Sequence, residues 1–278
     1  MMSGCRVASR TDSARGAART GALLWRRVMP PGSRDSGRRL PAVPGATILV
    51  IAALALLLGD GFASAAAQES ADGGGPVYVV PIHGPIDLGV ASFLRRALDE
   101  AEEAGARAVV LDLDTPGGRL DAVLQMRDAI LGAGVPTVAF VNREAFSAGA
   151  LITIASERIY MTPGAVYGAA TPVDGSGETA SEKVISAVRS TFRATAEERG
   201  RDPEIAAAMV DPDVEIDGLV GPDQLLTLTT TEARRVNYAD GVAADRTDLL
   251  ALTGLQGADV VETSPGLAEN VVRFLTNP

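Results

Sequence analysis

At 278 residues, 46% of them apolar, the chain is large enough to bury a substantial core, which excludes wholesale disorder. Its net charge of −10 is unevenly divided, because the first 67 residues hold nine Arg and three Asp and carry +6, which leaves −16 on the remainder. An acidic globular part argues against nucleic acid as a partner, since binding phosphates requires clustered Lys and Arg.

Residues 1–67 have the features of a leader. An Arg-rich stretch, which contains the only cysteine, precedes an uncharged apolar run of 13 residues at 46–58, shorter than the roughly 20 residues that span a bilayer. Small residues follow, and the pattern predicts a secretory signal cleaved after Ala67 or Ala65, with Met29 as a possible start. An uncleaved N-terminal anchor is the alternative. In both cases we expect the rest of the chain outside the cytoplasm, without any cysteine for disulfides, zinc or catalysis.

Apolar strands alternate with amphipathic helices from residue 76 onward. Strands are predicted at 77–82, 108–113, 136–141, 158–161 and 258–262, and helices at 88–104, 120–131, 146–155, 181–199, 203–210 and 230–238. Asp87 is placed to cap the first helix, and a Gly- and Pro-rich loop is expected at 163–177. The alternation at intervals of ~30 residues predicts one α/β domain, residues 76–263, with a mainly parallel sheet.

The last segment, residues 264–278, has the spacing of a short amphipathic helix. Leu267, Val271, Phe274 and Leu275 are expected along one side of it. Three placements stay open for such a helix: docking on the domain, lying on a membrane surface, or leading into a transmembrane segment.

The sequence Asp-Thr-Pro-Gly-Gly at 114–118 joins a buried strand to the start of a helix. Gly117 and Gly118 permit positive φ and let backbone N–H groups face open space. Such a nest beside a helix N-terminus favours developing negative charge and suits an oxyanion hole. An ordinary tight turn between strand and helix is the alternative interpretation.

Ser147 stands at the start of the predicted helix 146–155, among the small residues Ala148, Gly149 and Ala150. A serine in this place most often only caps the helix. Small neighbours, however, let a substrate backbone approach a nucleophile, and the N–H of Ala148 is placed to join an oxyanion hole. Ser147 is therefore a candidate cap and a candidate nucleophile.

A serine nucleophile needs a base, and the chain has one His and one Lys. His83 precedes a Gly-Pro turn, and we expect it to be a structural turn residue. Lys183 lies 36 residues after Ser147, at the start of a long helix. A lysine amine can act as a base when burial lowers its pKa well below about 10.4, and Ser-Lys pairs are an established variant of the serine triad. The alternative for Lys183 is a solvated residue of the first helical turn.

Asp112 and Asp114 alternate on a predicted strand and point the same way, but no second group of ligands lies near them in sequence, so a metal site is not expected. The sequence contains neither GxGxxG nor GxxxxGK[ST], so no nucleotide cofactor is indicated.

Taken together, these motifs resemble one family. The similarity to the NfeD-type membrane-bound serine peptidases, of the ClpP/crotonase superfamily and similar to signal peptide peptidase A, lies in residues 79–85, 111–118, 147–150, 161–164 and 168–172. It continues through Lys183 and covers nearly all of 76–263.

The resemblance implies a ββα superhelix that assembles as dimers or larger oligomers, with Ser147 as nucleophile and Lys183 as general base. Gly117 or Gly118, together with Ala148, would supply the oxyanion N–H groups. It also implies cleavage of hydrophobic segments of membrane proteins, notably stomatin-like partners, without a cofactor. Full-length family members continue into transmembrane helices and a small β-barrel domain, which would begin about where this sequence ends.

Two other functions stay open from the sequence. A crotonase-like acyl-CoA enzyme would share the superhelix and the oxyanion glycines, but it needs an acidic base and a cytoplasmic location, which the leader argues against. A non-catalytic assembly module for stomatin-like proteins would need neither Ser147 nor Lys183, and both are present.

Overall fold

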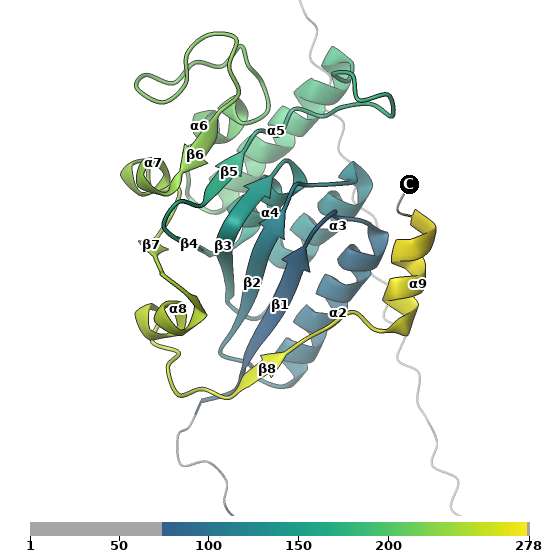
Figure 1. Ribbon diagram of the computed structural model, residues 1–278, viewed down its shortest axis with the longest axis vertical. Helices are drawn as coiled ribbons and strands as arrows, with labels where there is room; N and C mark the ends of the chain where they lie inside the picture. The colour runs from purple at the N-terminus through teal and green to yellow at the C-terminus, as the bar shows by residue number, and fades with distance from the viewer. Residues whose placement is uncertain (1–73, 277–278) are drawn as a thin grey trace, which may run out of the picture. The chain divides into compact units, whose positions relative to one another are not determined.

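A mixed eight-stranded sheet forms the centre of the domain in the computed structural model, which describes residues 74–276 (Figure 1). The strands are β1 (Val77–His83), β2 (Ala108–Thr115), β3 (Thr137–Phe146), β4 (Arg158–Met161), β5 (Val166–Gly168), β6 (Thr227–Thr229), β7 (Gly241–Val242) and β8 (Val260–Glu262). Their order is β6-β5-β3-β2-β1-β8, and β4 pairs with β3 and β7 beside this path. All strand pairs are parallel except β5 with β6. The predicted leader lies outside the described residues.

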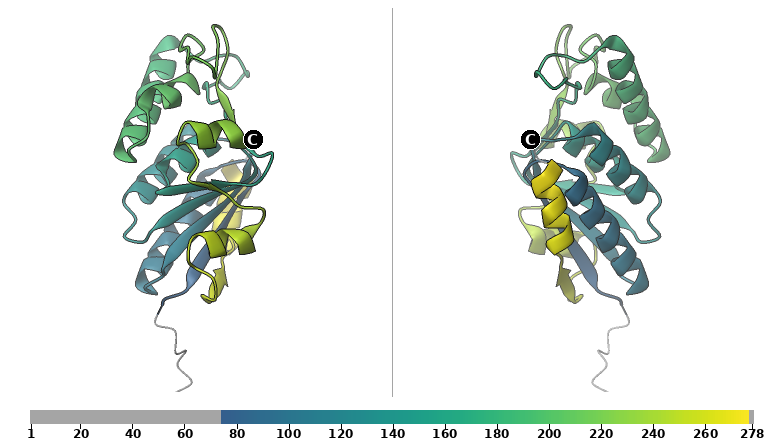
Figure 2. Two further views of the ribbon diagram at one scale, coloured as in Figure 1. Left: turned by 90° about the vertical axis from the view of Figure 1, so that its left-hand side faces the viewer. Right: turned by 90° about the vertical axis from the view of Figure 1, so that its right-hand side faces the viewer.

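Helices cover both faces of this sheet. They are α2 (Leu88–Glu103), α3 (Leu120–Leu131), α4 (Ala148–Ala155), α5 (Glu182–Glu198), α6 (Pro203–Ala208), α7 (Thr230–Arg235), α8 (Arg246–Leu252) and α9 (Leu267–Thr276). Figure 2 shows α2 and α3 on one face and α8 on the other. Side chains alternate accordingly along β1: Val80 and Ile82 join the larger core beneath α2, α3 and α4, while Val77 and Val79 join a smaller core with Leu249 of α8.

Several predicted elements are found as expected. Helix α3 has the predicted bounds, α2 ends one residue earlier than predicted, and α5 is shorter than predicted by one residue at each end. The carboxylate of Asp87 accepts hydrogen bonds from the N–H groups of Gly89 and Val90 at 2.8 and 3.0 Å, which confirms the predicted helix cap.

Strand β3 is longer than predicted. It continues past residue 141 to Phe146, because its last residues, from Glu144 onward, pair with β5. The exposed polar residues Asn142 and Arg143 interrupt its apolar run, so the sequence pattern indicated an early end. Consequently α4 begins at Ala148, and β5 lies within the stretch predicted as a loop.

The predicted C-terminal amphipathic helix is α9, which lies alongside α2 (Figure 1, Figure 2). Two ion pairs join it to α2 and to the residue that caps α2: Glu269 pairs with Arg96 at 2.7 Å and Arg273 with Asp87 at 3.4 Å. The backbone of Gly89 in α2 also packs closely against α9. The apolar side faces outward, with Leu267, Val271, Phe274 and Leu275 exposed. Within residues 74–276, no helix combines the length and hydropathy needed to cross a bilayer.

Candidate active site

Ser147 occupies the junction between β3 and α4 in a strained conformation, with φ 53° and ψ −114°. A non-glycine residue in such a region costs of order 1–3 kcal/mol and persists only where its surroundings hold it. The hold here comes from the Ser147 N–H, which donates to the carbonyl of Gly168 at 2.9 Å. The hydroxyl makes no helix-capping bond and no other hydrogen bond to the described residues. The half-buried Ser147 hydroxyl is thus uncommitted, and the simple capping role is not observed.

The two glycines of the loop after β2 pack against backbone on both sides. Gly117 has φ +104°, and a β-carbon there would lie 2.6 Å from Cβ of Ser147. A β-carbon on Gly118 would lie 2.1 Å from the carbonyl oxygen of Ile86. Ile86 also holds the loop by hydrogen bonds, since its N–H donates to Gly117 O at 2.8 Å and its carbonyl accepts from Arg119 N–H at 2.9 Å. Only glycine permits these approaches.

The N–H groups of this region differ in what they bind. Gly117 N–H donates to Oγ1 of Thr115 at 3.1 Å, so it is already engaged. The N–H groups of Gly118 and Ala148 find no acceptor among residues 74–276. Of the two loop glycines, Gly118 therefore has the free donor, and Ala148 offers a second one at the positive N-terminal end of α4.

Thr115 was not singled out from the sequence, yet it organises the loop. Its buried hydroxyl donates to Gly84 O at 2.7 Å while accepting from Gly117 N–H. Its methyl group lies against Gly149, where an added β-carbon would approach to 2.6 Å. One side chain therefore links the turn after β1, the glycine loop and α4. The only sequence signal was a polar β-branched residue at the end of a buried strand.

Two adjoining cavities lie in this region, and Ser147 borders one of them. The first, of about 220 Å³, is bordered by Ser147, Gly118 and Ala148. The second, of about 380 Å³, has a mainly apolar lining to which Lys183 contributes. The cavities adjoin because they share four apolar side chains: Leu120, Leu151, Val184 and Val188.

Lys183 and Ser147 are not hydrogen-bonded to each other in this structure. Lys183 is exposed in the first turn of α5, and it has no hydrogen bond or ion pair with other described residues. The Ser147 hydroxyl and the Lys183 amine border different cavities of the adjoining pair. The structure thus brings together Ser147, Gly117, Gly118 and Ala148, and the predicted base borders the adjoining cavity.

Polar side chains on β1, β2 and β3 contact one another across the strands. His83 Nε2 lies 3.6 Å from Oδ2 of Asp112, with the imidazole half-exposed. Arg143 Nε donates to Asp114 Oδ2 at 3.0 Å. Asp112 therefore lies beside a histidine and Asp114 is paired with an arginine, each on a neighbouring strand. No metal-binding group of His, Cys, Asp and Glu occurs in the part of the chain that the structure describes.

Sequence comparison defines the family of this α/β domain. Residues 76–263 match the family model of the N-terminal domain of NfeD1b, so the chain belongs to the NfeD family. It is 38% identical over 203 residues to the membrane protein NfeD1b of Bacillus subtilis, covering 73% of this chain and 46% of that protein. It is 31% identical over 226 residues to the membrane-bound protease PH1510 of Pyrococcus horikoshii, covering 73% and 48%. The chain spans about half the length of these relatives.

Solved structures with the same fold include 1510-N, a membrane-bound protease specific for stomatin. Its lysine-to-alanine variant in complex with a substrate peptide matches with a TM-score of 0.62 and 26% identity, covering 73% of this chain and 98% of that one. A serine-to-alanine variant matches with a TM-score of 0.60 and 27% identity, covering 69% and 99%. The predicted fold class, a single α/β domain with a mainly parallel sheet, is confirmed, and its fold is shared with 1510-N.

Proposed function

We propose that this chain is a serine endopeptidase in which Ser147 is the nucleophile and Lys183 the general base. The observation that carries the proposal is the strained Ser147, whose free hydroxyl borders a cavity next to two uncommitted N–H donors. Strained backbone of this kind clusters at catalytic sites. The serine and lysine variants of the related protease 1510-N support the same pair of residue types.

In the proposed reaction, Ser147 Oγ attacks the carbonyl carbon of a peptide bond while its proton passes to the Lys183 amine. The resulting oxyanion accepts hydrogen bonds from Gly118 and Ala148, and each such donor is typically worth about 10²–10³ in kcat. Lys183 then returns the proton to the leaving amine. Water, deprotonated by the same amine, hydrolyses the acyl-enzyme.

This chemistry needs Lys183 to move toward Ser147. Catalytic hydrogen bonds in free enzymes are often long and tighten only when substrate binds. The apolar cavity that Lys183 borders suits this step, since a hydrophobic substrate side chain in it would exclude water around the amine.

The proposed substrates are hydrophobic segments of membrane-associated proteins, with a stomatin-like protein as partner. The apolar lining near Lys183 supports this choice, as does the stomatin specificity of 1510-N. We further propose a membrane-associated, extracytoplasmic homo-oligomer, with a leader at 1–67, a peptidase domain at 76–263 and a C-terminal segment at 264–278 that leads toward the membrane. The membrane proteins among the relatives support the association with membranes.

A non-catalytic assembly module is the second candidate, because Lys183 is not hydrogen-bonded to Ser147 in this conformation. A crotonase-like acyl-CoA reaction is less compatible with the site, since no Asp or Glu borders the cavity at Ser147.

The deciding experiment compares the full chain with its Ser147→Ala variant on casein and on a peptide from an apolar membrane segment. We expect the parent to cleave the apolar peptide and the variant to leave it intact. Equal cleavage by both proteins would exclude Ser147 as the nucleophile. Binding without cleavage by either protein would favour the assembly module.

A further inference from the structure

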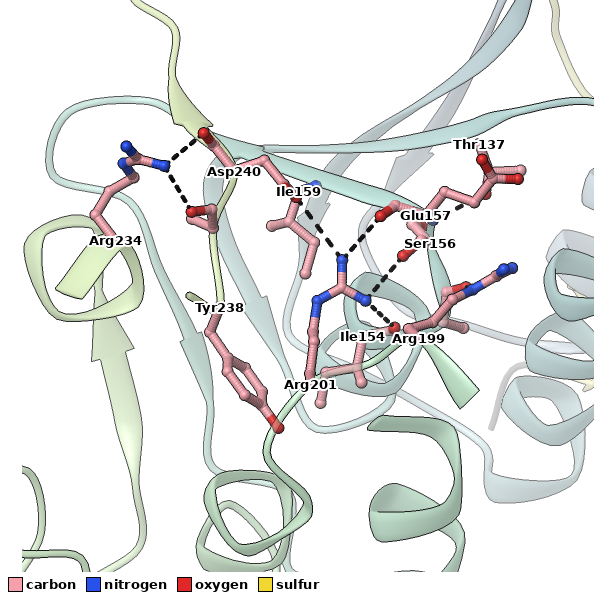
Figure 3. A network of polar contacts seen from close by, with 12 residues as sticks. Thr137, Ile154, Ser156, Glu157, Ile159, Arg199, Arg201, Arg234, Tyr238 and Asp240 are labelled. Carbon is pink, nitrogen blue, oxygen red and sulfur yellow. Dashed lines mark hydrogen bonds and ion pairs between the residues drawn. The ribbon is translucent and has the colours of Figure 1, made fainter. Parts of the chain in front are cut away.

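The carbonyl end of α4 is buried, and two arginines occupy it (Figure 3). All eight residues of α4 are buried. The last carbonyl groups of any helix lack partners within the helix, and leaving them unpaired away from water is costly. Arg199 Nε donates to Ala155 O at 2.6 Å, and Arg201 Nη1 donates to Ile154 O at 3.0 Å and Ser156 O at 3.1 Å. Cations at this end also interact favourably with the helix dipole.

Arg199 also reaches a second helix. Its Nη2 donates to the carbonyl of Ile130, in the last turn of α3, at 3.2 Å. One guanidinium therefore joins the C-terminal ends of α3 and α4. Because the guanidinium is planar and its donors are fixed, it sets the spacing of the two carbonyls more strictly than a lysine amine could.

Arg201 secures the same end of α4 to the sheet. Its side chain is only 6% exposed and lies 3.8 Å from Oδ2 of Asp240, and it donates to Glu157 O at 3.1 Å, just before β4. The carboxylate of Asp240 in turn accepts from the N–H of Ile159 in β4 at 2.7 Å. This network leaves α4 little freedom to tilt.

The opposite ends of the same two helices border the candidate active site. Gly118 lies two residues before Leu120, the first residue of α3, and Ala148 is the first residue of α4. With eight residues, α4 is about 12 Å long, so a tilt at its carbonyl end moves its N-terminus by a comparable amount. We propose that Arg199 and Arg201 are positioning residues that fix the Gly118 and Ala148 N–H groups relative to each other and to Ser147.

This inference rests on the proposed peptidase function. It is tested with Arg199→Met and Arg199→Lys in the full chain, and with Arg234→Met as control. Arg234 belongs to the same polar network but donates to Ala239 O and Asp240 O, away from α3 and α4 (Figure 3). Steady-state cleavage of the apolar membrane-segment peptide is measured well below the unfolding temperature of each variant.

Arg199→Met is expected to lower kcat roughly tenfold or more with KM near that of the parent, since a misplacement of about 1 Å can cost about 10²-fold. Arg199→Lys should recover part of the lost kcat, and Arg234→Met should have the kcat of the parent. If the parent is active, Ser147→Ala is inactive and Arg199→Met has an unchanged kcat, the positioning role is wrong while the proposed peptidase function stands. A parent without Ser147-dependent cleavage would instead remove the proposed function and this inference with it. If Arg199→Met does not fold, a parental kcat in Arg199→Lys decides against the inference.

Discussion

The backbone of Gly117 lies directly against the side chain of Ser147, so that a β-carbon on Gly117 would stand 2.6 Å from Cβ of Ser147. The same added carbon would lie 3.0 Å from Phe146 O and 3.2 Å from Ala148 N. The glycine loop and the candidate nucleophile are therefore fitted to each other at backbone level. A change on either side must displace the other.

Gly117→Ala is expected to abolish cleavage and to destabilise the fold, because the new methyl group collides with Ser147 and φ +104° is unfavourable for alanine. Gly164→Ala is the matched control. Gly164 also has positive φ, +82°, but an added β-carbon meets nothing within 4 Å. We expect the control to lose roughly 1 kcal/mol of stability at unchanged kcat. Peptide cleavage and thermal unfolding measure both effects, and an active Gly117→Ala enzyme would contradict the fit described above.

Thr115→Val should destabilise the domain by about 1–3 kcal/mol and lower kcat, because it leaves the buried Gly117 N–H and Gly84 O without their partner. Thr153→Val makes the same chemical change in α4, where the hydroxyl donates its hydrogen bond only to Gly149 O, a carbonyl of its own helix. That control should lower the free energy of unfolding much less than Thr115→Val does. Chemical denaturation gives both free energies of unfolding, and equal losses would argue against Thr115 as the organiser of the loop.

Lys183 is the only lysine in the chain, so acetylation of amines alters Lys183 and the N-terminus alone. We expect treatment with an acetylating reagent to abolish cleavage in step with modification of Lys183, as followed by peptide mass spectrometry. Lys183→Arg should be inactive before treatment, because arginine keeps the charge but does not release a proton. A protein that stays active after complete acetylation of Lys183 would exclude it as the base.

The ion pair between α9 and α2 predicts a pH-dependent stability. The hydrogen bond from Arg96, helped by the N–H of Gly266, holds the pKa of Glu269 below its ordinary value. A carboxylate with a lowered pKa in the folded state stabilises the fold above its unfolded-state pKa, and this contribution is lost as pH falls through the folded value. Glu269→Gln should therefore lower Tm at pH 7, and its difference from the parent should shrink below about pH 4.

Glu100→Gln is the control for that ion pair, because Glu100 pairs with the same Arg96 at 2.9 Å but from an exposed position. Exposed pairs of this kind contribute about 0–1 kcal/mol, so the control should have a smaller effect on Tm at pH 7. A Tm difference for Glu269→Gln that does not change with pH would show that the carboxylate charge is not what holds α9.

Local patterns predicted much of the fold. Residues 120–131 were assigned as a helix with the observed bounds, because their apolar spacing is helical and Gly132 follows. The end of β3 was missed because Asn142 and Arg143 interrupt its apolar run, while its pairing partner, β5, lies more than 20 residues away. Thr115, Arg199 and Arg201 were missed as organisers for a related reason: each acts through backbone groups distant in sequence, and such contacts leave no periodic pattern.

The sequence by itself determined the α/β alternation, the loop with two glycines and the candidate chemical groups, because apolar periodicity and residue type are local properties. Only the tertiary structure decided that Gly117 donates to Thr115 while Gly118 stays free, and that Lys183 borders the cavity adjoining that of Ser147. Which donor is free depends on every acceptor within about 3 Å of it. Such competition is resolved only when segments distant in sequence are packed together.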